Sequence, residues 1–351
     1  MFNLYNTTTL LDVIRVQPVV SSYWLDSFFG RSISFDTEEI MFDKVTNIRR
    51  IAPFVSPVVQ GRVMRTRGYE TRTFRPAYTK PKHIVDPNRQ FVRMAGEGIG
   101  GEMTPAQRWN TAVSENMREE REAITRLWNW MAAMATIHGR VTVEGEDYPT
   151  QVVDFGRDPS LLLTNTGNTR WGESASDPLA DIALMRRRAF EKSGTGINRL
   201  TMGLEAFDRF IQDQKVKDLM QVRNVERQSG TAISALVSQD VPYEFQGVLA
   251  GGNGQARLEI YTYNEMYEDA DGNSIPFMST HDVIGTGPGL QGVRCYGAIR
   301  DKRAGLQAMP MFPKMWDQED PSLTYTMTQS APLMVPAQPD NSFRIVTGDG
   351  Q

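Results

Sequence analysis

The residue types that most often carry chemistry are three histidines and one cysteine, and their spacing favours no reaction. His83, His138 and His281 lie far apart and share no metal-ligand spacing, so each is predicted to be an ordinary surface or core histidine. Cys295 lies among strand-forming residues, which favours a buried, inert thiol over a nucleophile. No His-Glu-x-x-His, Cys-x-x-Cys or Gly-x-Ser-x-Gly pattern occurs. These observations predict a protein without catalytic residues or a metal site.

Two segments match the Gly-x-Gly-x-x-Gly pattern of dinucleotide-binding turns. They are Gly96, Gly98 and Gly101, and Gly287, Gly289 and Gly292. A dinucleotide site needs a strand, a tight turn, a helix and then an acidic residue about 20 positions later. The first match leads into a long helical stretch, and the second is followed by the strand-like sequence VRCYGAI. Neither has the required context, so no cofactor is predicted.

Basic residues gather in the stretch from 56 to 95, where the only acidic residues are Glu70 and Asp86. Prolines interrupt any helix there, and the parity of Val63, Arg65 and Arg67 fits a strand. We predict a long projecting β-hairpin or loop, which is marginal in isolation and must be held from outside. The basic residues that we expect to make contacts are Arg62, Arg65, Arg67, Arg72, Arg75, Lys80 and Lys82.

Two partners fit this basic stretch. One is a nucleic acid, whose binding proteins usually carry a basic excess. The other is an acidic patch on an identical neighbour, which requires no excess of either sign. The chain has 38 basic and 42 acidic residues and a net charge of −4. This balance favours self-association.

Residues 1–37 have the composition of an arm rather than of a domain. Thr9 can cap a short helix, and four aromatic residues follow it: Tyr23, Trp24, Phe28 and Phe29. So many large apolar side chains in a short segment need a surface to pack on. Composition leaves open whether that surface lies on the chain's own body or on a neighbouring copy.

The elements that must position these residues are a mixture of helices and strands. Pro105 begins a helix that nothing breaks before Gly139, although Glu119, Glu120 and Arg121 interrupt its apolar stripe. Further helices are predicted at 178–192 and 204–220. Strands are predicted at 140–143, 151–155, 197–202, 257–263 and within 322–346, with a hairpin turn at 271–273. This pattern indicates an α+β fold.

The length of 351 residues favours two lobes, or one domain with extensions. A single cysteine cannot form an intrachain disulfide, and neither a signal peptide nor an apolar run of about 18 residues is present. We therefore expect synthesis in the cytoplasm and no membrane contact.

Several blocks of the sequence, in the right order, resemble lambda-type major capsid proteins of tailed bacteriophages, the major capsid protein E family. They are TTTLLDVIR with FDTEEI, PFVSPVVQGRVMRTRGYETRTFRPAYTKPKH, VVDFGRDPS with TRWGE, and GLQGVRCYGAIRDKRAGLQAMPMFPKMWDQEDPSLTYTMTQSAPLM. Residues 213–255 have no obvious counterpart. The alternatives are a tail or portal component of a phage, or a soluble hydrolase with an unrecognised site.

The resemblance implies the Hong Kong-97-type phage capsid fold and a structural role in the virion. The implied parts are an N-terminal arm (1–37), a peripheral domain (38–55 and 96–156) with a spine helix (105–138), an extended loop (56–95), an axial domain (157–292) and a return to the peripheral domain (293–351). The chain would form hexamers and pentamers of an icosahedral head around double-stranded DNA.

On this resemblance we expect the arm aromatics and the basic residues of the loop to contact neighbouring subunits. Gly96, Gly98, Gly100 and Gly101 would form a hinge between loop and body when the shell expands. The expected partners are other copies of the chain, a separate scaffolding protein and the portal, with non-specific contact to packaged DNA. A decoration protein, shell size and covalent cross-linking are left open.

Overall fold

The computed structural model describes residues 22–37, 39–45, 51–52, 54–61, 63, 69–90, 103–145, 148–217, 242–249, 257–269 and 272–348. The chain folds into two compact units. Unit 1 comprises Met1–Ile40, Phe74–Met131 and Val293–Met334, and unit 2 comprises Met41–Thr73, Ala132–Gly292 and Val335–Gln351. Of the segment 293–351, residues 293–334 belong to unit 1 and 335–351 to unit 2, where strand β18 (Ser342–Val346) lies between two other strands of the large sheet.

The predicted long helix is confirmed as α3 (Pro105–His138). Thr104 begins it, since its hydroxyl accepts from the Gln107 N–H at 3.3 Å. Gly139 ends it at a φ of +68°, a conformation that glycine adopts without the penalty of a Cβ. The helix begins in unit 1 and ends in unit 2.

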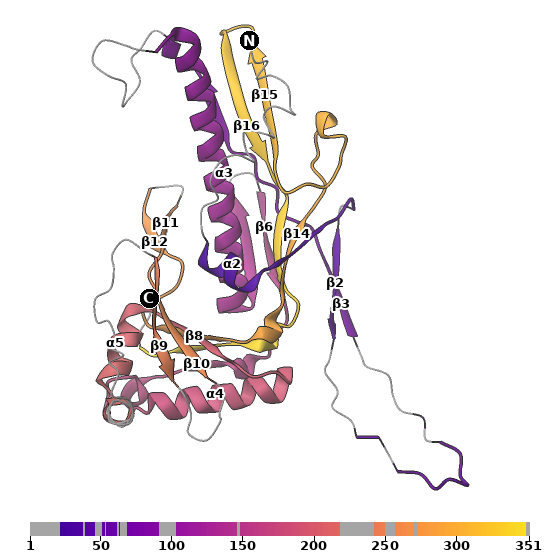
Figure 1. Cartoon of the computed structure of the whole chain (residues 1–351), viewed down its shortest axis with the longest axis vertical. Helices are drawn as coiled ribbons and strands as arrows, with labels where there is room; N and C mark the ends of the chain where they lie inside the picture. The colour runs from indigo at the N-terminus through magenta and orange to yellow at the C-terminus, as the bar shows by residue number, and fades with distance from the viewer. Residues whose placement is uncertain are drawn as a thin grey trace. The chain divides into compact units, whose positions relative to one another are not determined.

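Unit 1 packs α3 against an antiparallel sheet of order β15-β16-β4, and Figure 1 shows α3 running beside β15 and β16. Val85 and Met315 from the sheet join Val113 and Met117 of the helix in one buried cluster. A second sheet has the order β1-β14-β17, preceded by the short helix α2 (Tyr23–Phe28). The strands are β1 (Arg31–Ser34), β4 (Lys82–Val85), β14 (Gly292–Tyr296), β15 (Phe312–Gln318), β16 (Leu323–Gln329) and β17 (Pro332–Pro336).

Unit 2 is built on a six-stranded mixed sheet of order β7-β18-β13-β8-β10-β9. Side chains from α4 (Pro178–Ser193) and α5 (Leu204–Gln212) pack on one face of it, around Met185, Phe210 and Phe343, and Figure 1 shows α4 across that face. The strands are β7 (Leu162–Thr164), β8 (Arg199–Met202), β9 (Tyr243–Leu249), β10 (Leu258–Tyr263), β13 (Asp282–Thr286) and β18 (Ser342–Val346).

Three hairpins complete the described parts of unit 2. The predicted turn at 271–273 is confirmed by the pairing of β11 (Met266–Glu268) with β12 (Ser274–Pro276). The strands predicted after Gly139 are β5 (Arg140–Gly145) and β6 (Tyr148–Asp154). The base of the predicted projecting loop is a two-stranded ribbon of β2 (Ile40–Val45) and β3 (Tyr69–Phe74) (Figure 1).

One predicted helix is shorter than expected. We predicted 204–220, whereas α5 ends at Gln212. Asp213 takes an extended conformation there, and its carboxylate accepts from the Val216 N–H at 3.2 Å, which begins a new turn. A carboxylate that caps the following turn competes with the continuing helix.

The second glycine pattern has a packing explanation. A Cβ at Gly287 would lie 2.4 Å from the carbonyl oxygen of Gly196, and one at Gly289 would lie 2.2 Å from Thr195 Oγ1. Two loops of unit 2 therefore approach each other more closely than any larger residue allows. As the sequence context predicted, a short 3₁₀ turn (Pro288–Leu290) and then strand β14 follow, rather than the helix of a dinucleotide site.

Candidate interaction site: the arm helix, the loop and their anchors

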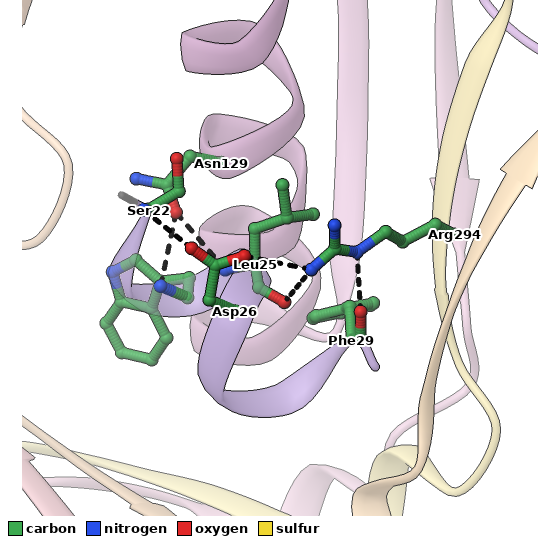
Figure 2. Close-up of polar contacts among 7 residues, drawn as sticks. Ser22, Leu25, Asp26, Phe29, Asn129 and Arg294 are labelled. Atoms are coloured by element: carbon green, nitrogen blue, oxygen red, sulfur yellow. Dashed lines mark hydrogen bonds and ion pairs between the residues drawn. The ribbon is translucent and has the colours of Figure 1, made fainter. Parts of the chain in front are cut away.

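The first anchor holds the N-terminal end of α2 to α3. Asn129 Oδ1 accepts from the backbone N–H groups of Trp24 (3.1 Å) and Leu25 (3.2 Å), as Figure 2 shows. The first N–H groups of any helix lack partners within the helix. Here a buried side chain from another helix supplies the acceptor, so α2 is held in place by its backbone.

The second anchor holds the other end of α2. Arg294, on β14, donates from Nε to the Phe29 carbonyl (2.5 Å) and from Nη2 to the Leu25 carbonyl (3.0 Å). The same nitrogen lies 3.0 Å from Asp26 Oδ1 (Figure 2). A cation at a helix C-terminus can hydrogen-bond the last carbonyl groups and interacts favourably with the helix dipole. Both ends of this six-residue helix are therefore capped by remote parts of unit 1.

The anchored helix buries its aromatic residues in the chain's own body. Tyr23, Trp24 and Phe29 are 3%, 0% and 0% exposed, with the Tyr23 and Trp24 rings edge to face at 5.3 Å. Composition left open whether these side chains pack on their own chain or on a neighbouring copy, and we predicted the neighbouring copy. The structure corrects this prediction for these three residues, which pack on their own chain. Of the four aromatic residues predicted to contact a neighbour, only Phe28 is half-buried and has exposed surface for such a contact.

The basic residues at the base of the loop also have partners within their own chain. Arg72 donates to the Asp154 carbonyl at 2.7 Å, and Arg75 lies 3.2 Å from Glu39. The ammonium groups of Lys80 and Lys82 lie over the rings of Tyr78 (5.3 Å) and Tyr325 (3.7 Å). Within its own chain, Arg72 therefore contacts a backbone carbonyl of unit 2, and its contact with a carboxylate of a neighbour stays a prediction.

Gly156 explains how Arg72 reaches that carbonyl. The glycine has a φ of +72°, and a Cβ there would lie 2.8 Å from Arg72 Nη2. The guanidinium therefore occupies the space that a larger residue would fill, at the end of β6. The rings of Phe42 and Phe155 lie 5.8 Å apart beside it. Together these contacts clamp the base of the β2-β3 ribbon to the rest of unit 2.

Glu120 was visible in the sequence only as an interruption of an apolar stripe. Its carboxylate is fully buried and accepts from the hydroxyls of Thr326 (2.8 Å) and Thr328 (2.6 Å) on β16. His83 Nδ1, on β4, lies 3.3 Å from it. Burial raises the pKa of Glu120 above its ordinary value, against the lowering effect of these hydrogen bonds. The cluster joins α3 to two strands of the three-stranded sheet, β16 and β4, through the Glu120 carboxylate.

Several apolar residues near the tip of the loop are almost fully exposed. Phe54 is 103% exposed, Val63 99%, Val58 91% and Ile51 90%. The segment 51–61 contains no charged residue. Scattered exposed hydrophobic residues are normal in a monomer, whereas a contiguous uncharged run of them marks an interaction site.

Burial shifts the pKa of two of the side chains that could carry chemistry. Burial raises the pKa of Cys295 to about 12, so its thiol stays protonated. His138, buried beside Arg344 at 3.1 Å, has a pKa lowered to about 4, first by burial. The described residues contain no group of three or more acidic, histidine or cysteine side chains that could hold a metal, and no described helix meets the length and hydropathy of a membrane span.

Several predicted residues lie outside the described part of the chain. They are Thr9, Arg62, Arg65 and Arg67, and the glycines of the predicted hinge, Gly96, Gly98, Gly100 and Gly101.

Comparison with known proteins finds relatives of one kind, which match nearly the whole chain. The model of the family described as phage major capsid protein E matches residues 6–347. The major capsid protein of Enterobacteria phage P21 is 31% identical over 349 residues, covering 96% of this chain and 97% of that protein. The major capsid protein of Escherichia phage lambda is 30% identical over 347 residues, with the same two shares.

Two solved structures have a fold similar to that of this chain. A prophage protein of Escherichia coli CFT073, described as a capsid protein, has a TM-score of 0.71 at 24% identity and covers 97% of this chain and 98% of its own. A phage-related protein of Bordetella bronchiseptica RB50 has a TM-score of 0.51 at 11% identity, covering 96% and 95%. At these identities the likeness concerns the fold alone.

Proposed function

The chain belongs to the phage major capsid protein E family, and from this premise we propose how its subunits join. It is a major capsid protein of a tailed-phage head, a structural protein of the virion with the Hong Kong-97-type fold, and not an enzyme. The proposal concerns which surfaces of one copy contact the next, and it starts from the residues that the isolated chain leaves uncovered.

We propose that the tip of the extended loop docks on a neighbouring copy. The observation that carries this proposal is the uncharged run containing Ile51, Phe54 and Val58, each at least nine-tenths exposed. Removing apolar area from water is the main driving force of association. An assembly of identical copies supplies a partner surface to every loop.

The basic residues then divide into two groups with different tasks. Arg72 and Arg75 hold the base of the loop within its own chain, which orients the tip. Arg62, Arg65 and Arg67 flank the uncharged run in sequence, and we propose that they meet carboxylates of the neighbour. Charged groups at the rim of an apolar contact fix its register more than they add affinity.

The remaining proposals concern the whole shell and rest on family membership. Hexamers and pentamers would build an icosahedral head around double-stranded DNA, which touches the inner surface through phosphates without sequence reading. A separate scaffolding protein and the portal would be partners, and a decoration protein would be optional. The glycine-rich stretch Gly96–Gly101 would let the loop change its angle when the shell expands, since glycine opposes few backbone rotations.

The loop contact can be tested with the variant Phe54→Ser/Val58→Ser. We expect folded protein that fails to form closed shells under conditions in which the wild type forms them, scored by electron microscopy and sedimentation. Val152→Ser is a matched control, because Val152 is also exposed (55%) but lies on β6. Normal shells from the double variant would overturn the proposal, as would equal losses in the variant and the control.

A further inference from the structure

A compact loop of unit 1, Ala298–Ala308, projects from the side of the β15-β16 hairpin. In Figure 1 it is the orange loop with a single helical turn beside these strands. A bridge between Ala298 and Ala308 closes its base, and the Ile299 N–H donates to the Gln307 carbonyl at 3.0 Å. The Ala308 N–H also donates to Asp36 at 3.1 Å. The loop is thus closed by its own backbone and supported by the arm segment.

Leu306, near the end of this loop, combines an unfavourable backbone with an exposed apolar side chain. Its φ is +59°, a region in which the Cβ of an L-residue crowds the backbone. Its side chain is 63% exposed. The preceding residue, Gly305, also has a positive φ, of +64°, but glycine adopts it freely. A leucine held in this conformation without burial in its own subunit contributes little to the fold.

The loop cannot relax away from this conformation because its interior is tied down. Ala304 packs with Ile299 and Phe312 in a small buried cluster. Asp301 accepts from the Arg303 N–H (2.8 Å) and from Lys314 (2.7 Å). Strained residues that surrounding contacts hold in place occur mainly at functional sites. The loop is therefore preorganised to present Leu306.

The two charged side chains that lie closest to Leu306 in the sequence of this loop are both basic. Lys302 and Arg303 are exposed, and Arg303 donates to a carbonyl, that of Met315, at 3.3 Å. Among the described residues, no carboxylate lies within ion-pair distance of Lys302 or Arg303. The only acidic side chain of the loop, Asp301, is already paired with Lys314. An exposed leucine flanked by two cations fits an apolar depression that is rimmed by carboxylates.

We propose that the loop Ala298–Ala308 is a second contact point between copies of this chain, with Leu306 entering an apolar depression of a neighbour and Lys302 meeting its carboxylates. A second copy is the occupant because the protein assembles into a shell of copies of itself, and the chain carries more acidic than basic residues. The inference rests on the proposed function, since it concerns the same assembly, but it involves a different surface from the loop tip.

The experiment compares Leu306→Asn and Leu306→Gly with the wild type in assembly of the full chain. Both residues accept a positive φ better than leucine does, so the unassembled protein should melt at an unchanged or higher temperature. The protein concentration needed for shell formation should rise about tenfold, the factor that corresponds to about 1.4 kcal/mol of lost burial. Lys302→Glu should raise it further, more strongly at low salt.

Matched controls lie in unit 2. Met266→Asn removes another exposed apolar side chain (53%), and Lys217→Glu makes the same charge change on another exposed lysine. The inference is overturned if Leu306 variants assemble like the wild type, or if the controls lose as much. The variant Phe54→Ser/Val58→Ser is scored beside them. Normal shells from that variant overturn the loop-tip proposal and leave the result for Leu306 standing, so the two failures are distinguishable.

Discussion

The arm helix and the tip of the extended loop are both rich in large apolar residues, and the structure treats them in opposite ways. Trp24 in α2 is fully buried, whereas Phe54 near the loop tip is fully exposed. The two segments differ in whether polar side chains hold their backbone, and not in how hydrophobic they are. Asn129 and Arg294 satisfy the backbone at both ends of α2, and no described residue anchors the segment 54–61 in a comparable way. An apolar segment packs on its own chain where its backbone groups find partners there.

The largest effect that we expect is on the buried side of this comparison. Trp24→Ala should lower the free energy of unfolding of the unassembled protein by about 3–5 kcal/mol, because it removes a buried aromatic side chain and leaves a cavity. Phe54→Ala should change it by less than about 0.5 kcal/mol, the usual effect of an exposed substitution. Urea titration measures both. Similar losses from the two variants would contradict the division between buried arm and exposed tip.

A smaller effect should distinguish the contribution of Asn129 to stability from that of the aromatic residues that it positions. Asn129→Ala removes the acceptor of two backbone N–H groups and should cost about 2 kcal/mol, as the loss of a helix N-cap or a buried acceptor does. Asn129→Asp keeps an acceptor oxygen and serves as the control. Hydrogen exchange of the Trp24 and Leu25 amides should accelerate in the alanine variant. Unchanged protection of these amides would mean that the aromatic packing, rather than Asn129, holds α2.

The smallest effect that we expect is a pH dependence of the stability, caused by the buried carboxylate of Glu120. Because its pKa is raised in the folded protein above the ordinary 4.5, folding is favoured by protonation. That contribution is fully present below pH 4.5 and is lost as the pH rises through the raised pKa. Glu120→Gln carries no such proton, so its stability relative to the wild type should increase as the pH rises above 4.5.

Thermal melts of the wild type and Glu120→Gln between pH 4 and pH 8 would measure this difference. His83 and Glu119 also face the cluster, so the comparison should be repeated in a His83→Gln background. A difference between the two proteins that stays constant with pH would show that Glu120 does not change its proton affinity on folding.

The elements that depend on neighbours in sequence could be predicted from the sequence. The bounds of α3 follow from Pro105 and Gly139, and α4 begins at its Asp177 cap and ends at Gly194. The absence of catalytic motifs and the order of the family blocks are likewise properties of the linear chain. These features require only local backbone preferences and short-range caps.

Only the tertiary structure decided where the polar groups find their partners. Trp24 and Asn129 are separated by 105 positions, and Glu120 and Thr328 by 208. No periodicity links residues so far apart, so Glu120 looked like an interruption of an apolar stripe and nothing singled out Asn129. The same holds for Arg72, whose partner depends on the positive φ of Gly156. Local composition determines which side chains need a partner, and the path of the folded chain determines whether that partner lies within the same subunit.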